Sequence, residues 1–328
     1  METGRINGGV NLVGDIGGTN ARFALADVDS DAIHSPRTLP VADFPTLEDA
    51  MRAYLDGQGV SGVDRACVAV AGPVYGDHFS LTNAHWSFSC SAVRKRMGFR
   101  SLDLLNDWAA MAYAVPPMPD EALCPVGNGG PRPRRTLVAL GPGTGLGLAA
   151  LTPFGHENWA LISGEGGHIA FAPLNARERD LLAVLEGMVG GRVSVERLLS
   201  GMGIESVYQA LARLDGVSAP LNTAADISQA GQDGTDPLAV ETLKIFSATL
   251  GSFAGDVALL MGAYGGVYLG GGILPRMKDT FLKSDFRARF EDKGRMRPLM
   301  EAMPTFLIEE DYPALHGAAE FLALKDAD

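Results

Sequence analysis

A glycine-containing turn between two apolar runs occurs twice in this chain, and this duplication constrains the fold more than any other feature. Residues 10–25 (VNLVGDIGGTNARFAL) and residues 136–151 (TLVALGPGTGLGLAAL) each predict two β-strands joined by a short turn. A third glycine cluster, Gly270-Gly271-Gly272, follows the apolar residues 267–269. The repeated hairpin predicts two similarly built α/β halves with a cleft between them.

The turns have the composition of an anion-binding site. A glycine without Cβ lets the backbone approach a bulky anion closely, and successive N–H groups form a concave anion site. Asp15 ends the first apolar run and could face Mg²⁺, a cation that prefers oxygen ligands. A surface hairpin would explain the first stretch equally well. A P-loop is excluded because no lysine follows the last glycine of any of the clusters. The dinucleotide-binding fingerprint does not fit either, because a predicted strand rather than a helix follows the glycines at 141–147.

Other polar residues stand at positions suited to substrate binding. Asn106 and Asp107 follow a predicted strand at residues 102–105, and ligand sites of α/β sheets lie at the carboxyl ends of strands. Asp107 could instead cap the predicted helix at residues 108–114. Glu165 and His168 flank a Gly-Gly turn, and their side chains complement the hydroxyls of a sugar. A structural role is the alternative for His168.

Helix signals are clear in several other segments. Helices are predicted over residues 43–55, 90–97, 176–185, 193–199, 204–214, 237–261 and 315–325. Thr46, either Ser89 or Ser91, and Asp236 are the expected capping residues. Residues 215–236 are small and polar and are interpreted partly as loop. Glu196 falls in the first turn of the predicted helix at 193–199, where interaction with the helix dipole is the alternative to a binding role.

Composition excludes several classes of function. The 328 residues suit two domains, and the net charge of −12 argues against nucleic acid as a partner. Three well-separated cysteines give neither a disulfide framework nor zinc-ligand spacing and indicate a reducing cytoplasm. The N-terminal residues lack an apolar signal core, and no run is predicted to span a bilayer.

Six short motifs occur in an order that resembles bacterial ATP-dependent glucokinases, a hexokinase-like family of the actin, Hsp70 and sugar kinase superfamily. Each motif is weak alone, but together they span nearly the whole chain. They are GDIGGTNAR at residues 14–22, LND at 105–107, GTGLG at 143–147, GEGGH at 164–168, SVER at 194–197 and GGGILPR at 270–276.

The resemblance implies a two-domain α/β fold of the actin-like ATPase (ribonuclease H-like) type with its active site in the interdomain cleft. Residues 1–112 plus 309–328 would form a small domain and residues 113–308 a large one. The implied reaction transfers the γ-phosphoryl group of Mg-ATP to glucose, giving glucose 6-phosphate. Asp107 would be the general base, and the residues implied to hold the sugar are Asn106, Asp107, Glu165, His168 and Glu196. The residues implied to hold ATP are Gly14, Asp15, Gly17, Gly18, Thr19, Asn20, Gly143, Thr144, Gly145, Gly271 and Gly272, with Asp15 also the implied Mg²⁺ ligand.

The resemblance also implies a cytoplasmic homodimer that binds neither nucleic acid nor membrane. Two alternative functions stay open: a kinase for another hexose such as mannose or fructose, and a sugar-sensing regulator without catalysis. The regulator needs a DNA-reading module, yet only nine residues precede the first predicted strand. The related repressor, open-reading-frame and kinase family carries a cysteine-rich zinc loop, whereas residues 171–192 contain no cysteine.

Overall fold

The computed structural model describes the whole chain except residues 1–8, 29–31, 82–83, 129, 131 and 327–328. The chain forms two compact units, one comprising Met1–Pro119 and Glu310–Asp328 and the other Asp120–Glu309. Each unit has its own mixed sheet and its own hydrophobic core, with the C-terminal helix belonging to the first unit.

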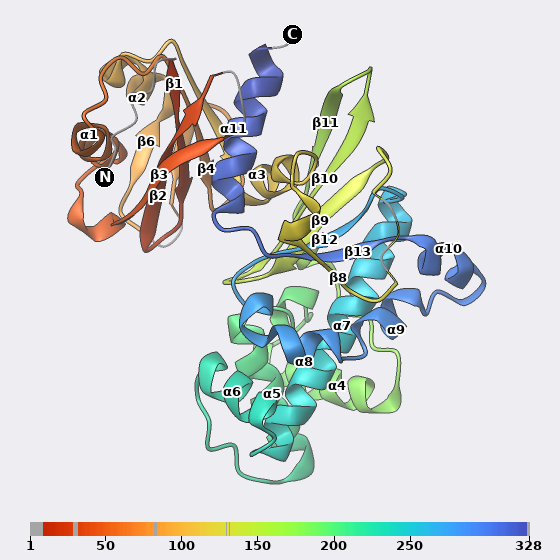
Figure 1. Cartoon of the computed structure of the whole chain (residues 1–328). Helices are drawn as coiled ribbons and strands as arrows, with labels where there is room; N and C mark the ends of the chain where they lie inside the picture. The colour runs from red at the N-terminus through yellow and green to blue at the C-terminus, as the bar shows by residue number, and fades with distance from the viewer. Residues whose placement is uncertain (1–8, 29–31, 82–83, 129, 131, 327–328) are drawn as a thin grey trace. The chain divides into compact units, whose positions relative to one another are not determined.

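The first unit is built on a five-stranded sheet in the order β3-β2-β1-β4-β7 (Figure 1). Strands β1, β4 and β7 are parallel, while β1, β2 and β3 form an antiparallel meander. The strands are β1 (Val10–Ile16), β2 (Asn20–Asp27), β3 (Ile33–Pro40), β4 (Arg65–Val70) and β7 (Ser101–Asn106), with β5 (His78–Ser80) and β6 (Ser87–Ser89) as a separate pair. The helices are α1 (Leu47–Gln58), α2 (Cys90–Met97), α3 (Asp107–Ala114) and α11 (Pro313–Asp326).

The second unit contains a six-stranded sheet in the order β11-β10-β9-β12-β13-β8. Its strands are β8 (Leu123–Pro125), β9 (Leu137–Pro142), β10 (Leu146–Phe154), β11 (Asn158–Ser163), β12 (Gly266–Leu269) and β13 (Thr305–Ile308). Its helices are α4 (Ala176–Val189), α5 (Gly201–Asp215), α6 (Ala224–Asp233), α7 (Pro237–Met261), α8 (Lys278–Leu282), α9 (Phe286–Glu291) and α10 (Arg297–Ala302). Short 3-10 turns are Val41–Asp43 in the first unit and Asp120–Ala122, Gly166–His168, Val195–Arg197, Leu274–Met277 and Gly294–Met296 in the second.

Both predicted hairpins are confirmed. Strands β1 and β2 pair antiparallel across the turn that begins at Gly17, and β9 and β10 pair antiparallel across the turn at residues 143–145. The caps are confirmed as well, because the side chains of Thr46, Ser89 and Asp236 accept backbone N–H bonds at the starts of α1, α2 and α7. These are local signals, which the sequence carries within a few residues.

Two predictions about the second unit were wrong. Residues 193–199 do not form a helix, because Phe171 N donates to Val193 O at 3.0 Å and Val195 N donates to Ile169 O at 2.9 Å. These extended pairings leave only a 3-10 turn, Val195–Arg197. The interpretation of residues 215–236 as partly loop is confirmed, and the interval also contains helix α6, which Thr223 caps. The prediction that no run could span a bilayer does not hold for α7, which is long and apolar enough by length and composition, with a mean hydropathy of 1.4 over 18 residues. Of those 18 residues, 78% are buried inside the protein.

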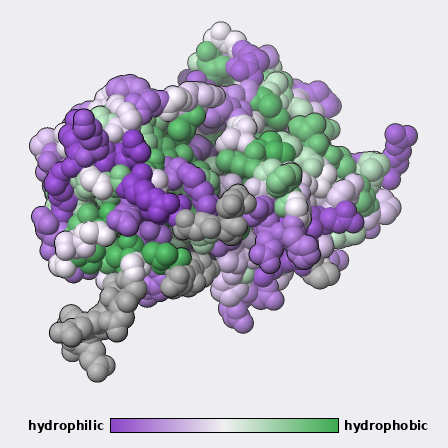
Figure 2. Space-filling model, turned by 90° about the horizontal axis from the view of Figure 1, so that it is seen from above, coloured by the Kyte–Doolittle hydropathy of each residue, from purple (hydrophilic) through white to green (hydrophobic). Residues whose placement is uncertain are grey.

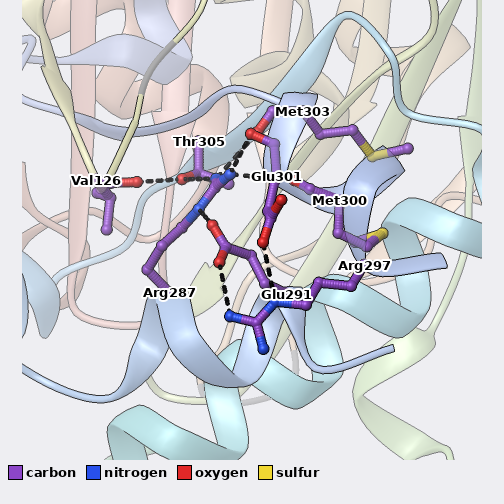
Figure 3. A network of polar contacts seen from close by, with 8 residues as sticks. All are labelled: Val126, Arg287, Glu291, Arg297, Met300, Glu301, Met303 and Thr305. Atoms are coloured by element: carbon purple, nitrogen blue, oxygen red, sulfur yellow. Dashed lines mark hydrogen bonds and ion pairs between the residues drawn. The ribbon is translucent and has the colours of Figure 1, made fainter. Parts of the chain in front are cut away.

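A buried arginine ties the end of the second sheet to the helices beside it (Figure 3). The Arg287 side chain is 12% exposed, and each of its five N–H groups has an acceptor. Thr305 Oγ1, one of these acceptors, donates to Val126 O at 2.5 Å. The acceptors of Arg287 are Glu291 Oε1 at 2.6 Å, Met303 O and Thr305 Oγ1 at 2.9 Å, and Met300 O and Glu301 O at 3.0 Å.

Helix α11 packs on α3 at a point where only glycine fits. A Cβ added at Gly317 would lie 1.7 Å from the backbone oxygen of Ala110. We therefore expect Gly317→Ala to force the two helices apart and lower the free energy of unfolding by roughly 1–3 kcal/mol, the usual cost of overpacking. Urea unfolding monitored by circular dichroism measures this change.

Gly57→Ala is the matched control, because Gly57 is also helical and lies in the same unit. Its Cβ would meet only the Arg37 guanidinium at 3.5 Å, an ordinary contact. This control should be neutral or stabilising by up to about 1 kcal/mol, since alanine is the better helix former. Equal unfolding curves for the two variants would contradict the packing account.

Candidate active site

The first unit brings the N-terminal hairpin turn and the Asn106-Asp107 pair to one edge of its sheet. Ile16 of β1 is in register with Val70 of β4, and Val70 is in register with Asn106 of β7. These three parallel strands therefore end in the same row, with Ile16 and Asn106 about 10 Å apart across two strand spacings. The chain turns after each strand, so polar groups from distant parts of the sequence converge there.

Asn106, and not Asp107, caps helix α3. The Asn106 Oδ1 atom accepts from Trp108 N at 3.0 Å and from Ala109 N at 3.3 Å. Its Nδ2 donates to Gly72 O at 3.1 Å, which fixes the amide. Asp107 is the first residue of the helix, and its Oδ1 lies 2.9 Å from Trp108 N. The alternative that Asp107 is the N-cap is therefore wrong, because Asn106 accepts the capping hydrogen bonds.

Asp15 lies at the end of β1 opposite Arg22 of β2. Arg22 Nη1 is 2.9 Å from Asp15 Oδ2, and the Asp15 side chain is 21% exposed. Burial raises the pKa of the Asp15 carboxyl, and Arg22 works against that rise by charge and hydrogen bonding. Sequence reasoning gave Arg22 no role, although the antiparallel register of a two-strand hairpin could have shown that it faces Asp15.

The turn between β1 and β2 is fixed by backbone bonds. Gly17 N donates to Asn20 O at 2.9 Å, and Val41 N donates to Thr19 O at 2.9 Å. A Cβ at Gly17 would have only Asn20 O as a close neighbour, at 3.6 Å. Gly14 differs, because a Cβ there would lie 3.2 Å from the Phe23 ring inside the core. The structure therefore places Gly14 in the packing of the strand and Gly17 to Asn20 in the turn.

The second unit brings two glycine clusters that are far apart in sequence into contact. Strands β9 and β12 are parallel neighbours with Leu140 opposite Leu269, so the turns that follow them leave the sheet together. A Cβ at Gly141 would lie 2.1 Å from Gly270 O, and one at Gly271 would lie 2.4 Å from Pro142 O. Gly271 also has a φ of +89°, a conformation that favours glycine.

The two turns differ in how much free space their remaining glycines face. The nearest atom to a Cβ at Gly143 would be Gly145 O at 4.0 Å, and a Cβ at Gly272 would meet nothing within 4 Å. Their outer surfaces therefore have room for another molecule, while Gly141 and Gly271 hold the turns together.

Glu165, His168 and Glu196 gather beside the turn at residues 143–145. The 3-10 turn Gly166–His168 packs on β10, because a Cβ at Gly167 would lie 2.5 Å from Leu146 O. Glu165 and His168, which flank the two glycines of this turn, are exposed. Glu196 reaches the same strand, since its Oε2 accepts from Leu146 N at 2.9 Å. The alternative helix-dipole role of Glu196 is wrong, as no α-helix forms at 193–199.

Comparison with known proteins decides the family. The family model described as Glucokinase matches residues 12–325. The chain is 46% identical over 323 residues to a glucokinase of Chromobacterium violaceum, covering 98% of this chain and 92% of the relative. It is also 46% identical to a glucokinase of Marinobacter nauticus, covering 95% and 97% of the two chains.

This chain belongs to the glucokinase family. The crystal structure of a glucokinase from an Antarctic psychrotroph agrees, with a TM-score of 0.88 and 39% identity over 95% of this chain and 98% of the other. The fold is accordingly the two-domain actin-like type that the sequence predicted. Among the described residues, no group of three or more His, Cys, Asp or Glu side chains is arranged to hold a metal ion.

The contact between the two glycine clusters of this chain is open to a direct test. Gly141→Ala should lower the free energy of unfolding by about 1–3 kcal/mol or more, because its Cβ would collide with a backbone carbonyl that cannot move alone. Gly143→Ala, two residues away in the same turn, should leave stability unchanged within about 0.5 kcal/mol. Thermal unfolding of both variants measures the difference, and similar losses at the two positions would argue against the close approach.

Proposed function

We propose that this glucokinase-family chain transfers the γ-phosphoryl group of ATP to the 6-hydroxyl of glucose, with Asp107 as general base. Family membership supports the reaction and both substrates, since relatives named glucokinase are 46% identical over nearly the whole chain. The observation that carries the assignment of Asp107 is the N-cap formed by Asn106. Asp107 follows the carboxyl end of a parallel strand, where ligand sites of α/β sheets lie, and Asn106 rather than Asp107 caps the helix. The Asp107 carboxylate is therefore positioned to act on a substrate.

In this proposal Asp107 orients the 6-hydroxyl of glucose and accepts its proton as the new bond forms. The hydroxyl oxygen attacks the γ-phosphorus, the bond from that phosphorus to the bridging oxygen breaks, and ADP leaves. Phosphoryl transfer depends mainly on positioning and on charge stabilisation. The proton goes to the Asp107 carboxylate and from there to solvent.

The sugar would be held by Asn106 together with Glu165, His168 and Glu196. Asn106 has one Nδ2 hydrogen left after its bond to Gly72, and that hydrogen could donate to a sugar hydroxyl. Carboxylates accept from hydroxyls, and an imidazole both donates and accepts, so these side chains suit a polyhydroxylated ligand. Asn106 belongs to the first unit, and the other three residues belong to the second.

The nucleotide would be held by the glycine turns. The N–H groups of the two hairpin turns, residues 17–20 and 143–145, would bind phosphates, and the turn at Gly271 and Gly272 would lie near adenosine. The room beside Gly143 and Gly272 fits a ligand there. Asp15 suits Mg²⁺, because hard cations take carboxylate oxygens and Mg²⁺ is commonly bound by one or two carboxylates plus substrate phosphates. Bound Mg²⁺ would offset phosphate charge.

We further propose that the protein is a cytoplasmic homodimer with no membrane attachment. Large hydrophobic side chains are exposed in the second unit, where Leu260 is 81%, Phe154 67% and Tyr264 46% exposed. Hydrophobic areas also lie among hydrophilic ones on the face shown in Figure 2.

Sedimentation velocity should give twice the mass of one chain, and Leu260→Lys should lower the measured mass toward that of a single chain. A single-chain mass for the parent protein would exclude the dimer.

Replacement of Asp107 tests the catalytic assignment. Asp107→Ala should lower kcat by about 10²–10⁴, the usual contribution of a positioned base. Its thermal stability should stay close to that of the parent, because the α3 cap is intact. The assay couples glucose 6-phosphate formation to a dehydrogenase, and ATP binding is measured separately by calorimetry.

Asn106→Asp is the matched control at the neighbouring position. Asp and Asn are equally good N-caps, so α3 should be retained, while the Nδ2 donations to Gly72 O and to the sugar are both lost. This control should raise the KM for glucose with a smaller effect on kcat. Near-normal turnover of Asp107→Ala would show that Asp107 is not the general base.

A further inference from the structure

The turn at residues 143–145 is held in place by a segment fifty residues further along the chain. Within the turn, Gly143 N donates to Gly145 O at 2.7 Å. From outside, Gly201 N donates to Gly143 O at 3.0 Å, and Glu196 Oε2 accepts from Leu146 N at 2.9 Å. The two ends of the turn are therefore each tied to the segment that runs from Glu196 to the start of α5.

That segment is itself rigidly built. Ser200, which is 1% exposed, caps α5 by accepting from Gly203 N at 3.0 Å. The same hydroxyl donates to the backbone oxygen of Glu196 at 2.9 Å. The Glu196 backbone is thus fixed to the capped start of a helix, and its side chain projects from a stable base onto the turn.

The Glu196 carboxylate touches the turn closely. A Cβ at Gly145 would lie 2.6 Å from Glu196 Oε2, so only glycine leaves space for this contact. The other carboxylate oxygen, Oε1, accepts no hydrogen bond from the part of the chain that the structure describes. One oxygen therefore supports the turn, and the second is left to meet a ligand.

We propose that Glu196 is a positioning residue for the nucleotide as well as a sugar ligand. Its Oε2 holds the N–H of Leu146 and with it the shape of the phosphate-binding turn, while its Oε1 receives a glucose hydroxyl. One carboxylate then joins the glucose subsite to the nucleotide subsite inside the second unit. Because such coupling is reciprocal, glucose would tighten ATP binding and ATP would tighten glucose binding by the same factor. This proposal rests on the proposed glucokinase site.

The test measures nucleotide binding in the absence of sugar, where a residue that contacts only glucose has no effect. Calorimetric titration with the magnesium complex of a non-hydrolysable ATP analogue supplies the dissociation constant. Glu196→Ala should weaken it roughly ten-fold, the order expected when a hydrogen bond to a charged group is lost. Glu196→Gln should stay within about three-fold of the parent, since its amide oxygen also accepts from Leu146 N.

Two further variants bracket the result. Glu165→Ala should weaken glucose binding and leave the analogue unaffected, because Glu165 makes no hydrogen bond to the turn among the described residues. Gly143→Val, whose side chain would enter the phosphate side of the turn, should weaken the analogue with the fold intact. If Glu196→Ala does not fold, Glu196→Asp provides the same test, since it keeps the charge but is one methylene too short to reach Leu146 N.

The outcomes separate this proposal from the proposed function. Parent-like binding of the analogue by folded Glu196→Ala or Glu196→Asp would overturn the positioning role, even if the KM for glucose rises. A Glu196→Gln variant as weak as Glu196→Ala would also contradict it, because the supporting hydrogen bond is kept. Unchanged glucose affinity in both Glu165→Ala and Glu196→Ala would instead reject the sugar site, leaving the analogue measurement to decide the positioning role.

Discussion

The candidate nucleotide site depends on one backbone contact, where the position of a Cβ at Gly141 lies 2.1 Å from the carbonyl oxygen of Gly270. Parallel pairing of β9 with β12 brings the two turns to one edge, and Gly270 N completes the pairing by donating to Leu140 O at 3.0 Å. A side chain at Gly141 or Gly271 would push the turns apart. Two clusters separated by about 130 residues thus form one surface because both lack side chains where they meet, and the remaining glycines are free to face a ligand.

The two hairpins are similar in sequence but are held by different forces. The first turn is closed by backbone bonds from Gly17 and Val41, and its neighbouring charge, Asp15, is balanced by Arg22 across the strand pair. The second turn is also closed by a backbone bond, from Gly143 N to Gly145 O, but among the described residues it has no comparable charge pair and is supported by the carboxylate of Glu196. If Glu196 binds the sugar as proposed, the second turn can respond to that ligand.

Local features of this fold could be predicted from the sequence, and features created by tertiary pairing could not. The hairpins, the caps at Thr46 and Asp236, and the core helix α7 follow from turn chemistry and apolar spacing within a short window. The false helix at 193–199 had a plausible pattern, but its N–H and C=O groups pair with residues 169–171. The site residues were predicted from the order of the motifs, whereas the bond from Leu146 N to Glu196 spans fifty residues and has no local signature.

At the start of α3 the N-cap is Asn106 and not Asp107, and this arrangement bears on the proposed role of Asp107 as general base. An N-cap residue is extended, and Asn106 has φ −63° and ψ 147°, so Asp107 begins the helix with its side chain beside the N–H groups of the first turn. That end of a helix favours negative charge. In the proposed mechanism the Asp107 carboxylate would orient the 6-hydroxyl of glucose at this helix end, and orienting the hydroxyl contributes more to phosphoryl transfer than removing its proton early. A neutral cap followed by an acidic first residue suits the proposed base, because Asn106 Oδ1 accepts from both Trp108 N and Ala109 N, whereas Asp107 Oδ1 accepts from Trp108 N at this helix end.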